Sequence, residues 1–285
     1  MKIKNNRRIY VSDLDGTLLH DDATLSAYSR KKIIELLDAG VHFTVASARS
    51  VVSLWQVLRK MPFRLPVIEL NGAFISNFQT GEHLIVNDIT KNLTADIYSY
   101  ILEYNCMPFI STFNGKEDCL YYQAMPNDGM QWYHDNRRIS RDRRLRHVPD
   151  LKKTFADHVV AFTVINTRQQ LKNLANRMMD DFSDRLQMHF FENPYSPPWH
   201  WLTIHDKKAC KAYAMRELVK YAGLKFEDLT VFGDNLNDIN MFKTAPRAIA
   251  VQNATEQIKG LATETIGPNT DDSVVKFIIA ETMRS

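Results

Sequence analysis

Short apolar runs alternate with longer amphipathic stretches over the first quarter of the chain. The runs at residues 9–11, 41–46 and 66–70 have the length and apolar content of buried strands. Between them, apolar residues at helical spacing predict helices over residues 25–39 and around residues 54–58. Strands and helices that alternate with short links are typical of a doubly wound parallel sheet, so the sequence predicts a Rossmann-like α/β core.

The pattern changes at about His83. From there we predict helices at 93–104 and 169–181, strands at 107–113, 119–123, 159–166 and 185–191, and a helical or irregular stretch at 127–136. Strands in this order pair more naturally as an antiparallel α+β unit than as a continuation of the first sheet. Residues 194–200 contain three prolines and resemble a linker, so we expect an inserted second domain over residues 84–200.

The alternating pattern returns after this insert. Strands are predicted at 201–204, 229–232 and 248–251, and helices at 207–221, 239–243 and 272–281. The predicted core domain therefore consists of residues 1–83 and 201–285.

The composition does not point to a nucleic-acid or fibrous class. The 285 residues include 45% hydrophobic and 24% charged side chains, which is ordinary for a globular protein, and the formal net charge of +3 is too small to indicate nucleic-acid binding. Six arginines gather in residues 137–146, but no aromatic residue lies within this run. A solvated loop is the favoured interpretation, and nucleic acid is not an expected partner.

The chain shows no pattern of a signal peptide, and no apolar run approaches the length of a membrane span. The three cysteines are odd in number and lack metal-ligand spacing. We therefore expect reduced thiols in a cytoplasmic protein that has no membrane partner. The sequence leaves both a monomer and a homodimer open.

Two carboxylates directly follow the first predicted strand. Asp13 and Asp15 stand one residue apart and are followed by Gly16, which permits a sharp turn, and Thr17, which can fix the loop. If the strand persisted, both acids would share one face and would need a cation or a proton between them. A solvated Asp-Gly turn is the alternative interpretation of this stretch alone.

Further polar residues fall at the ends of other predicted strands. Ser47 and Asn71 follow the second and third strands, and Asp234 and Asp238 follow a later one. The carboxyl ends of parallel strands form the edge at which such sheets bind ligands. Acids without histidine or cysteine favour Mg²⁺. With the Ser47 hydroxyl and the Lys211 ammonium available to hold phosphate, the set predicts phosphoryl transfer through an aspartyl-phosphate.

At these positions the sequence resembles the haloacid dehalogenase superfamily of phosphatases. Asp-Leu-Asp-Gly-Thr at 13–17 resembles the first motif of the superfamily, Ser47 the second, Lys211 the third, and Gly-Asp-Asn-Leu-Asn-Asp at 233–238 the fourth. The insert between the second and third motifs resembles the type C2 cap of the Cof-like, subclass IIB members. Asn-Gly-Ala at 71–73 and Val-Gln-Asn-Ala at 251–254 also resemble that subclass.

The resemblance implies a role for each motif. Asp13 would be the nucleophile and a metal ligand, and Asp15 would be the general acid and base, with its backbone carbonyl on Mg²⁺. Asp234 and Asp238 would complete the metal site. Catalytic roles would also fall to Ser47 and Lys211, which would neutralise the charge of the transferring phosphoryl group. The implied phosphate or substrate contacts are Ser47, Arg49, Asn71, Gly72, Lys211 and Asn237.

The sequence departs from the motifs of the superfamily in three places. Ser-Ala-Arg at 47–49 stands where Thr-Gly-Arg is usual, and serine keeps the hydroxyl. Alanine, instead of glycine, follows Lys211, and Lys207 and Lys208 are nearby alternatives for its role. Gln252 replaces a glycine, which can alter the loop near the metal.

The predicted function is a Mg²⁺-dependent phosphatase for a small phosphorylated metabolite, such as a sugar phosphate or pyridoxal phosphate. The insert would close over the substrate and select it. A phosphomutase of the same superfamily is one alternative. A non-catalytic phosphometabolite-binding protein is another, although no nucleophile or metal ligand is missing from the motifs.

Overall fold

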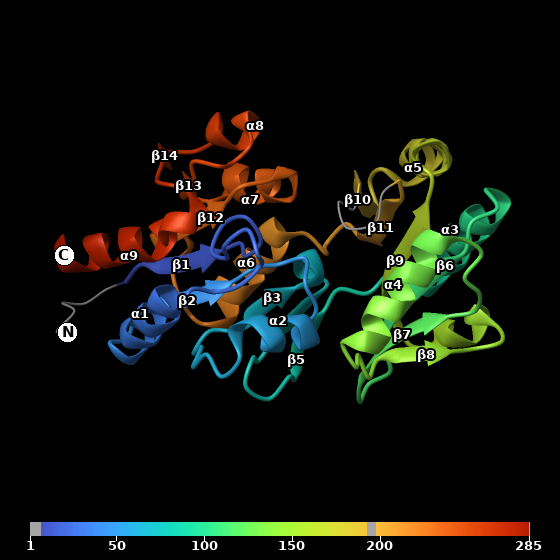
Figure 1. The fold of residues 1–285 in the computed structure, drawn as a ribbon, viewed down its shortest axis with the longest axis horizontal. Helices are drawn as coiled ribbons and strands as arrows, with labels where there is room; N and C mark the ends of the chain where they lie inside the picture. Colours follow the sequence, from blue (N-terminus) through green and yellow to red (C-terminus); the bar gives the residue numbers. More distant parts are fainter. Residues whose placement is uncertain (1–6, 193–197, 285) are drawn as a thin grey trace. The chain divides into compact units, whose positions relative to one another are not determined.

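The computed structural model describes residues 7–192 and 198–284, and the chain divides into two compact units. Unit 1 consists of Met1–Ile85 and Cys210–Ser285, and unit 2 consists of Val86–Ala209. Figure 1 labels the elements of both units and colours them by their position in the sequence, from blue to red. No helix in the described ranges is long and apolar enough to cross a membrane.

Unit 1 is built around a five-stranded parallel sheet with the order β14-β13-β12-β1-β2. Its strands are β1 (Ile9–Ser12), β2 (His42–Val45), β12 (Leu229–Gly233), β13 (Arg247–Ala250) and β14 (Glu264–Thr265). The side chains of β1 are buried throughout, as expected for a central strand with both faces covered. The predicted α/β fold with a parallel sheet is confirmed.

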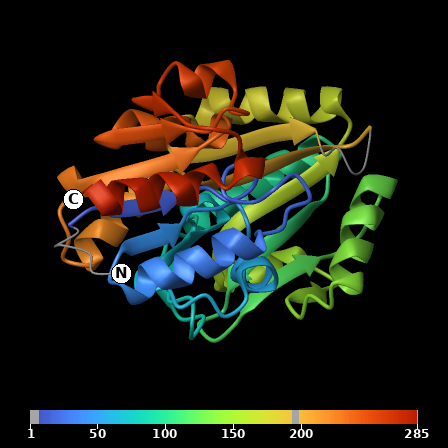
Figure 2. The same cartoon turned by 60° about the vertical axis from the view of Figure 1, so that its left-hand side comes forward.

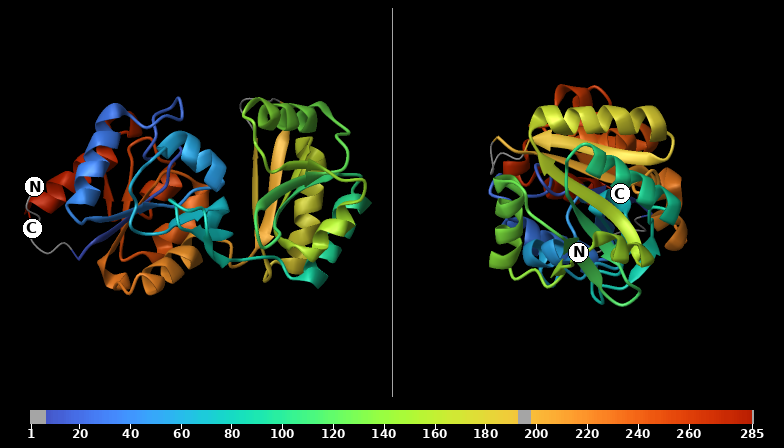
Figure 3. Two further views of the ribbon diagram at one scale, coloured as in Figure 1. Left: turned by 90° about the horizontal axis from the view of Figure 1, so that it is seen from below. Right: turned by 90° about the vertical axis from the view of Figure 1, so that its right-hand side faces the viewer.

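Helices cover both faces of this sheet. The helices α1 (Ala27–Asp38) and α9 (Ser273–Arg284) pack together on one face, and α6 (Lys211–Tyr221) and α7 (Ile239–Thr244) lie on the other, as Figures 2 and 3 show. The connection from β1 to β2 passes through α1 and runs towards one edge of the sheet. The connection from β12 to β13 passes through α7 and runs towards the other edge. Right-handed crossovers in opposite directions place their helices on opposite faces.

A second, three-stranded sheet adjoins the first at β2. It has the order β3-β4-β5, with β3 (Val67–Glu69), β4 (Phe74–Ser76) and β5 (His83–Val86). A single parallel bridge between Ala46 and Ile68 links β3 to the end of β2. The remaining elements of unit 1 are α2 (Val51–Leu58), α8 (Glu256–Lys259) and the 3₁₀ turns η1 (Leu70–Gly72), η3 (Phe226–Asp228), η4 (Leu236–Asp238) and η5 (Asn269–Asp271).

Unit 2 contains a six-stranded sheet with the order β10-β11-β9-β6-β7-β8, in which only the pair β7–β8 is parallel. The strands are β6 (Pro108–Phe113), β7 (Asp118–Tyr122), β8 (Leu145–His147), β9 (His158–Asn166), β10 (Leu186–Glu192) and β11 (His200–Asp206), and η2 (Leu151–Ala156) precedes β9. The helices α3 (Lys91–Glu103) and α5 (Arg168–Phe182) pack on one face, and α4 (Asp128–Ile139) packs on the other.

Residues 201–204 form a strand, as predicted, but its assignment to the parallel core is wrong. They were expected to begin the return to the parallel core, but they lie in β11, which pairs antiparallel with β9 and β10 in unit 2. An apolar run of this length fits either sheet, and its pairing partners are remote in sequence. The predicted linker at 194–200 falls largely outside the described residues, and its last residue, His200, begins β11.

Candidate active site

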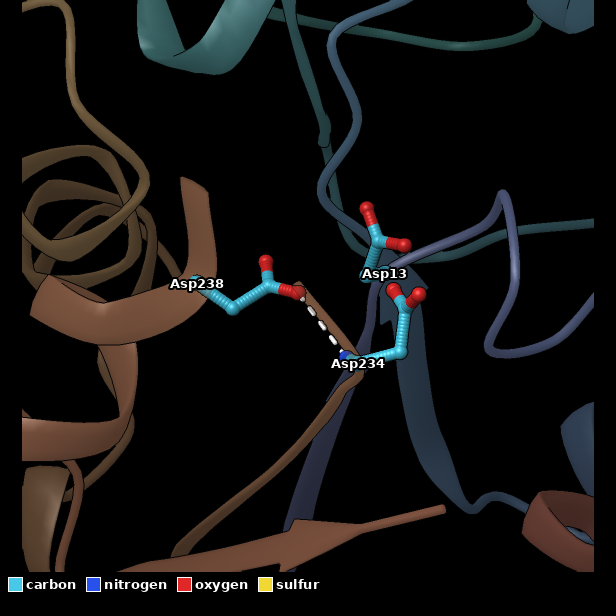
Figure 4. Close-up of side chains that lie close together, drawn as sticks. All are labelled: Asp13, Asp234 and Asp238. Atoms are coloured by element: carbon cyan, nitrogen blue, oxygen red, sulfur yellow. Dashed lines mark hydrogen bonds between the residues drawn. The ribbon is translucent and has the colours of Figure 1, made fainter. Parts of the chain in front are cut away.

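Three carboxylates meet at the carboxyl edge of the parallel sheet in unit 1. Asp13 follows β1, while Asp234 and Asp238 follow β12, the neighbouring strand. Each offers one oxygen, and these oxygens lie within 4.8 Å of one another (Figure 4). The backbone N–H of Asp13 donates to the carbonyl of Phe232 at 2.9 Å, which continues the strand pairing up to this acidic cluster.

The ammonium of Lys211 joins the acidic cluster. Lys211 is the first residue of α6 and is only 2% exposed. Its Nζ donates to Oδ1 of Asp13 and, at 2.7 Å, to Oδ1 of Asp238. The alternatives Lys207 and Lys208 are exposed and belong to unit 2. The sequence favoured Lys211 over these two alternatives, and the structure has the ammonium of Lys211 at the acids.

Burial changes the pKa values of this cluster. It raises the pKa of Asp13 well above the ordinary value, and the positive charge of Lys211 offsets part of that rise. Burial lowers the pKa of Lys211, but the charges of Asp13 and Asp238 outweigh it, so the net shift is upward and the ammonium stays charged. Burial, followed by the charge of Asp238, raises the pKa of Asp234 to about 6.

The donor set of the cluster fits a divalent oxygen-binding cation. When all groups are ionised, three carboxylates and one ammonium leave a formal charge of −2. Every donor is an oxygen, which Mg²⁺ prefers over the nitrogen and sulfur ligands of zinc sites.

Asp238 holds the loop that follows β12. Its Oδ2 accepts the backbone N–H groups of Asp234 at 3.1 Å and Asn235 at 3.3 Å, and its Oδ1 accepts from Lys211. Figure 4 shows the bond between Asp238 and the Asp234 backbone. Gly233 permits this close approach, because a Cβ there would lie 2.6 Å from Oδ2 of Asp238. N–H donors therefore occupy both oxygens of Asp238.

The loop after β1 is tied to the loop after β12. Thr17 donates to Oδ1 of Asp234 at 3.0 Å. Gly16 has a φ of +76°, and a Cβ on it would lie 2.5 Å from Oδ2 of Asp234. Asn253 donates to the carbonyl of Gly16 at 2.7 Å. Sequence reasoning gave Thr17 a loop-fixing role but could not name its partner.

The carboxylate of Asp15 lies apart from the acidic cluster and pairs with Arg49. Nε and Nη2 of Arg49 donate to the two carboxylate oxygens, at 2.8 and 2.5 Å, in a bidentate fork. β1 ends at Ser12, so strand periodicity does not bring the side chain of Asp15 beside that of Asp13. Arg49 was expected to contact phosphate, and sequence spacing gave no sign of this ion pair.

The other predicted phosphate contacts occupy the neighbouring strand ends. Ser47 is buried, and its carbonyl accepts the backbone N–H of Asn71 at 2.9 Å. Asn71 has a positive φ of 57°, and its Oδ1 accepts from Asn237 at 3.5 Å. Gly72 packs against the turn before α6, where a Cβ would lie 2.8 Å from the carbonyl oxygen of Cys210. These contacts bring three strand ends of unit 1 together.

Nearly the whole chain matches a known family. The haloacid dehalogenase-like hydrolase family matches residues 10–278. The chain belongs to this family. A 5-amino-6-(5-phospho-D-ribitylamino)uracil phosphatase of Bacillus subtilis is 24% identical over 274 residues, covering 93% of this chain and 94% of that one. A pyridoxal phosphate phosphatase of Escherichia coli is 24% identical over 286 residues, covering 95% and 97%.

A solved structure from Thermotoga maritima is similar over 94% of this chain and 95% of its own, with 29% identity and a TM-score of 0.76. The family match and the matched phosphatases confirm the superfamily and the Cof-like branch predicted from the motifs. The protein is a hydrolase of the haloacid dehalogenase type.

Proposed function

We propose that this protein is a Mg²⁺-dependent phosphatase that hydrolyses a small phosphorylated metabolite through an aspartyl-phosphate. One observation carries the proposal: the buried carboxylate of Asp13 accepts from Lys211 and lies within 4.8 Å of two further carboxylates. The names of two relatives support the substrate class, because both act on phosphate esters of small metabolites. Pyridoxal phosphate or a sugar phosphate is the kind of substrate that we expect.

Asp13 and Asp234 would hold Mg²⁺, together with the backbone carbonyl of Asp15. The ion, when bound, would supply positive charge to the phosphoryl oxygens. Asp238 would position Lys211 and the loop of Asp234, because its oxygens accept hydrogen bonds from the Lys211 ammonium and from the loop backbone. The formal charge of −2 in the cluster supports a divalent ion over a monovalent one.

The residues of the chain would carry two chemical steps. In the first, the carboxylate of Asp13 attacks phosphorus, the bond to the leaving alcohol breaks, and Asp15 gives that alcohol a proton. In the second, Asp15 takes a proton from water, which attacks phosphorus and releases Asp13 and inorganic phosphate. Lys211 and Ser47 would bind the phosphoryl oxygens. Lys211 also favours the ionised nucleophile, because its charge lowers the pKa of Asp13.

The ion pair with Arg49 orients the carboxylate of Asp15. A bidentate guanidinium fixes the direction of the carboxyl group more firmly than a single bond does. We therefore assign Arg49 to positioning Asp15, in addition to the phosphate contact expected from sequence.

Unit 2 would be the cap domain that selects the substrate. It lies in the chain between the second and third motifs, and it is compact by itself. The three cysteines are free thiols, which supports the expected cytoplasmic location.

Hydrolysis of p-nitrophenyl phosphate by the full-length protein tests the proposal. Turnover should require Mg²⁺, stop with EDTA and vanish in Asp13→Asn. Asp38→Asn removes an exposed carboxylate from the end of α1 and is the matched control, with wild-type activity expected. Turnover that persists in Asp13→Asn would exclude the aspartyl-phosphate.

A screen of phosphorylated metabolites, with inorganic phosphate as the readout, then identifies the substrate. Ester phosphate that moves to another hydroxyl without release of inorganic phosphate would indicate a mutase instead. Substitutions in unit 2 should change the ranking of kcat/KM among metabolites more than they change turnover of p-nitrophenyl phosphate.

A further inference from the structure

A cavity of about 460 Å³ opens in unit 1 away from the acidic cluster. Trp55 of α2, Arg59 just after it and Phe78 after β4 contribute to its lining. β4 runs antiparallel to β3, and its last residue, Ser76, pairs with Val67, the first residue of β3. The turn after β4 therefore lies at the amino end of β3, opposite the edge where the carboxylates meet.

The walls of the cavity are tied to one another. Nε1 of Trp55 donates to the carbonyl of Phe78 at 2.8 Å, and Nε2 of Gln79 donates to the carbonyl of Met61 at 3.1 Å. Phe78 is buried and meets Phe63 edge to face at 5.2 Å between ring centroids. These contacts join α2 to the β4–β5 turn, so the cavity is formed before any ligand binds. Trp55 as a whole residue remains 40% exposed.

Two cations border this apolar cavity. Arg59 and Lys60 line it and are exposed, and neither has a carboxylate within ion-pair distance among the described residues. The described lining residues include no acid. Arg30 lies nearby and donates to the carbonyls of Leu58 and Val57. Burial lowers the pKa of Arg30, and the charge of Arg59 lowers it further, which indicates a positive potential at this end of α2.

We propose that this cavity binds a small planar aromatic anion, with its ring against Trp55 and its carboxylate, sulfonate or phosphate at Arg59 and Lys60. The volume falls within the range of roughly 300–1,000 Å³ for small-molecule sites. The exposed part of Trp55 provides stacking area, and the charges of Arg59 and Lys60 favour a negative group over a neutral one. The proposal does not depend on the catalytic function, because the cavity and the acidic cluster share no residue.

The test uses ¹⁵N-labelled full-length protein and the aromatic sulfonate 8-anilinonaphthalene-1-sulfonate as the probe. The chain has four tryptophans, and Trp55 is the one in unit 1, because Trp132, Trp199 and Trp201 belong to unit 2. Trp55→Phe assigns the indole N–H signal of Trp55. The probe should shift that signal saturably. Its failure to shift at millimolar probe would overturn the proposal.

A charge variant tests the role of the cations. Arg59→Gln/Lys60→Gln changes two exposed side chains and should raise the Kd of the sulfonate about tenfold, as expected for two partly exposed charge contacts. The neutral analogue N-phenyl-1-naphthylamine should bind both proteins equally. Lys31→Gln/Lys243→Gln removes the same net charge from exposed positions elsewhere in unit 1 and is the matched control. Equal Kd values for the sulfonate in the two double variants would overturn the assignment of Arg59 and Lys60.

Discussion

Lys211→Met tests whether a buried ammonium holds the acidic cluster together. Lys211 is 2% exposed and donates to Asp13 and Asp238, so its removal leaves two buried carboxylates without their counter-charge. Breaking a buried ion pair by removing one partner costs about 3–5 kcal/mol. Methionine has a similar length and packs flexibly, so little of this cost comes from a void. We expect the metal-free variant to lose about 3–5 kcal/mol of unfolding free energy near pH 8.

The loss of unfolding free energy in Lys211→Met should become smaller as the pH falls. Burial already raises the pKa of Asp13, and Lys211 offsets part of that rise. Without Lys211, the folded-state pKa moves further above the unfolded value of about 3.9. The native state then binds protons more tightly than the unfolded state, so protonation stabilises the variant as the pH falls through the folded-state pKa towards the unfolded value.

Urea unfolding in EDTA, near pH 8 and near pH 5.5, measures both effects. Lys208→Met is the matched control, because Lys208 is exposed, and it should change stability by no more than about 0.5 kcal/mol. A loss in Lys211→Met below about 1 kcal/mol near pH 8, or one that is the same at both pH values, would refute the reasoning. With Mg²⁺ present, kcat should fall by about 10²- to 10³-fold.

Three further predictions concern the same site. Burial raises the pKa of Asp234 to about 6, so ionisation above that pH penalises the native state. Lowering the pH from about 7 to 5 in EDTA should stabilise wild type by about 1 kcal/mol relative to Asp234→Asn in urea unfolding, and an equal pH dependence of the two proteins would contradict this. Gly16→Ala should abolish most Mg²⁺-dependent turnover, because the new Cβ would lie 2.5 Å from a carboxylate oxygen of Asp234. Gly115→Ala is the control: Gly115 also has a positive φ, but no atom lies within 4 Å of the position of a Cβ, so this variant should only be less stable and should keep the wild-type kcat. Arg49→Gln should lower kcat about tenfold or more, because Asp15 loses the two bonds that orient its carboxylate. Arg49→Lys should restore little of this loss because an ammonium cannot form the bidentate fork, and a wild-type kcat in Arg49→Gln would exclude the positioning role.

The sequence predicted the parallel core because its signals are local. The strands β1, β2 and β12 are short apolar runs, and each helix between them has its own apolar spacing. The carboxyl ends of parallel strands lie at one edge of a sheet. The order of the motifs along the chain therefore also predicted that Asp13 would lie near Asp234 and Asp238.

The contacts that the sequence could not show are non-local. Residues 201–204 fit the core pattern as well as they fit β11, because the two choices differ only in remote pairing partners. The fork between Asp15 and Arg49 depends on the loop after Ser12 and on the start of α2. The bond from Thr17 reaches Asp234 across 217 positions, and no spacing rule anticipates such a pair.

The split of unit 1 into two chain segments bears on how the protein is made. The central strand β1 pairs with β2 and β12, and β12 leaves the ribosome only after all of unit 2. At a synthesis rate of about 5–20 residues per second, the loop that carries Asp13 waits roughly 10–40 s for Asp234 and Asp238. During that time one edge of β1 is unpaired and open to wrong pairing. Unit 2 is one continuous segment and can fold first. A chain that stops within unit 2 would carry Asp13 but neither Asp234 nor Asp238, and it would expose an apolar strand that chaperones and proteases recognise.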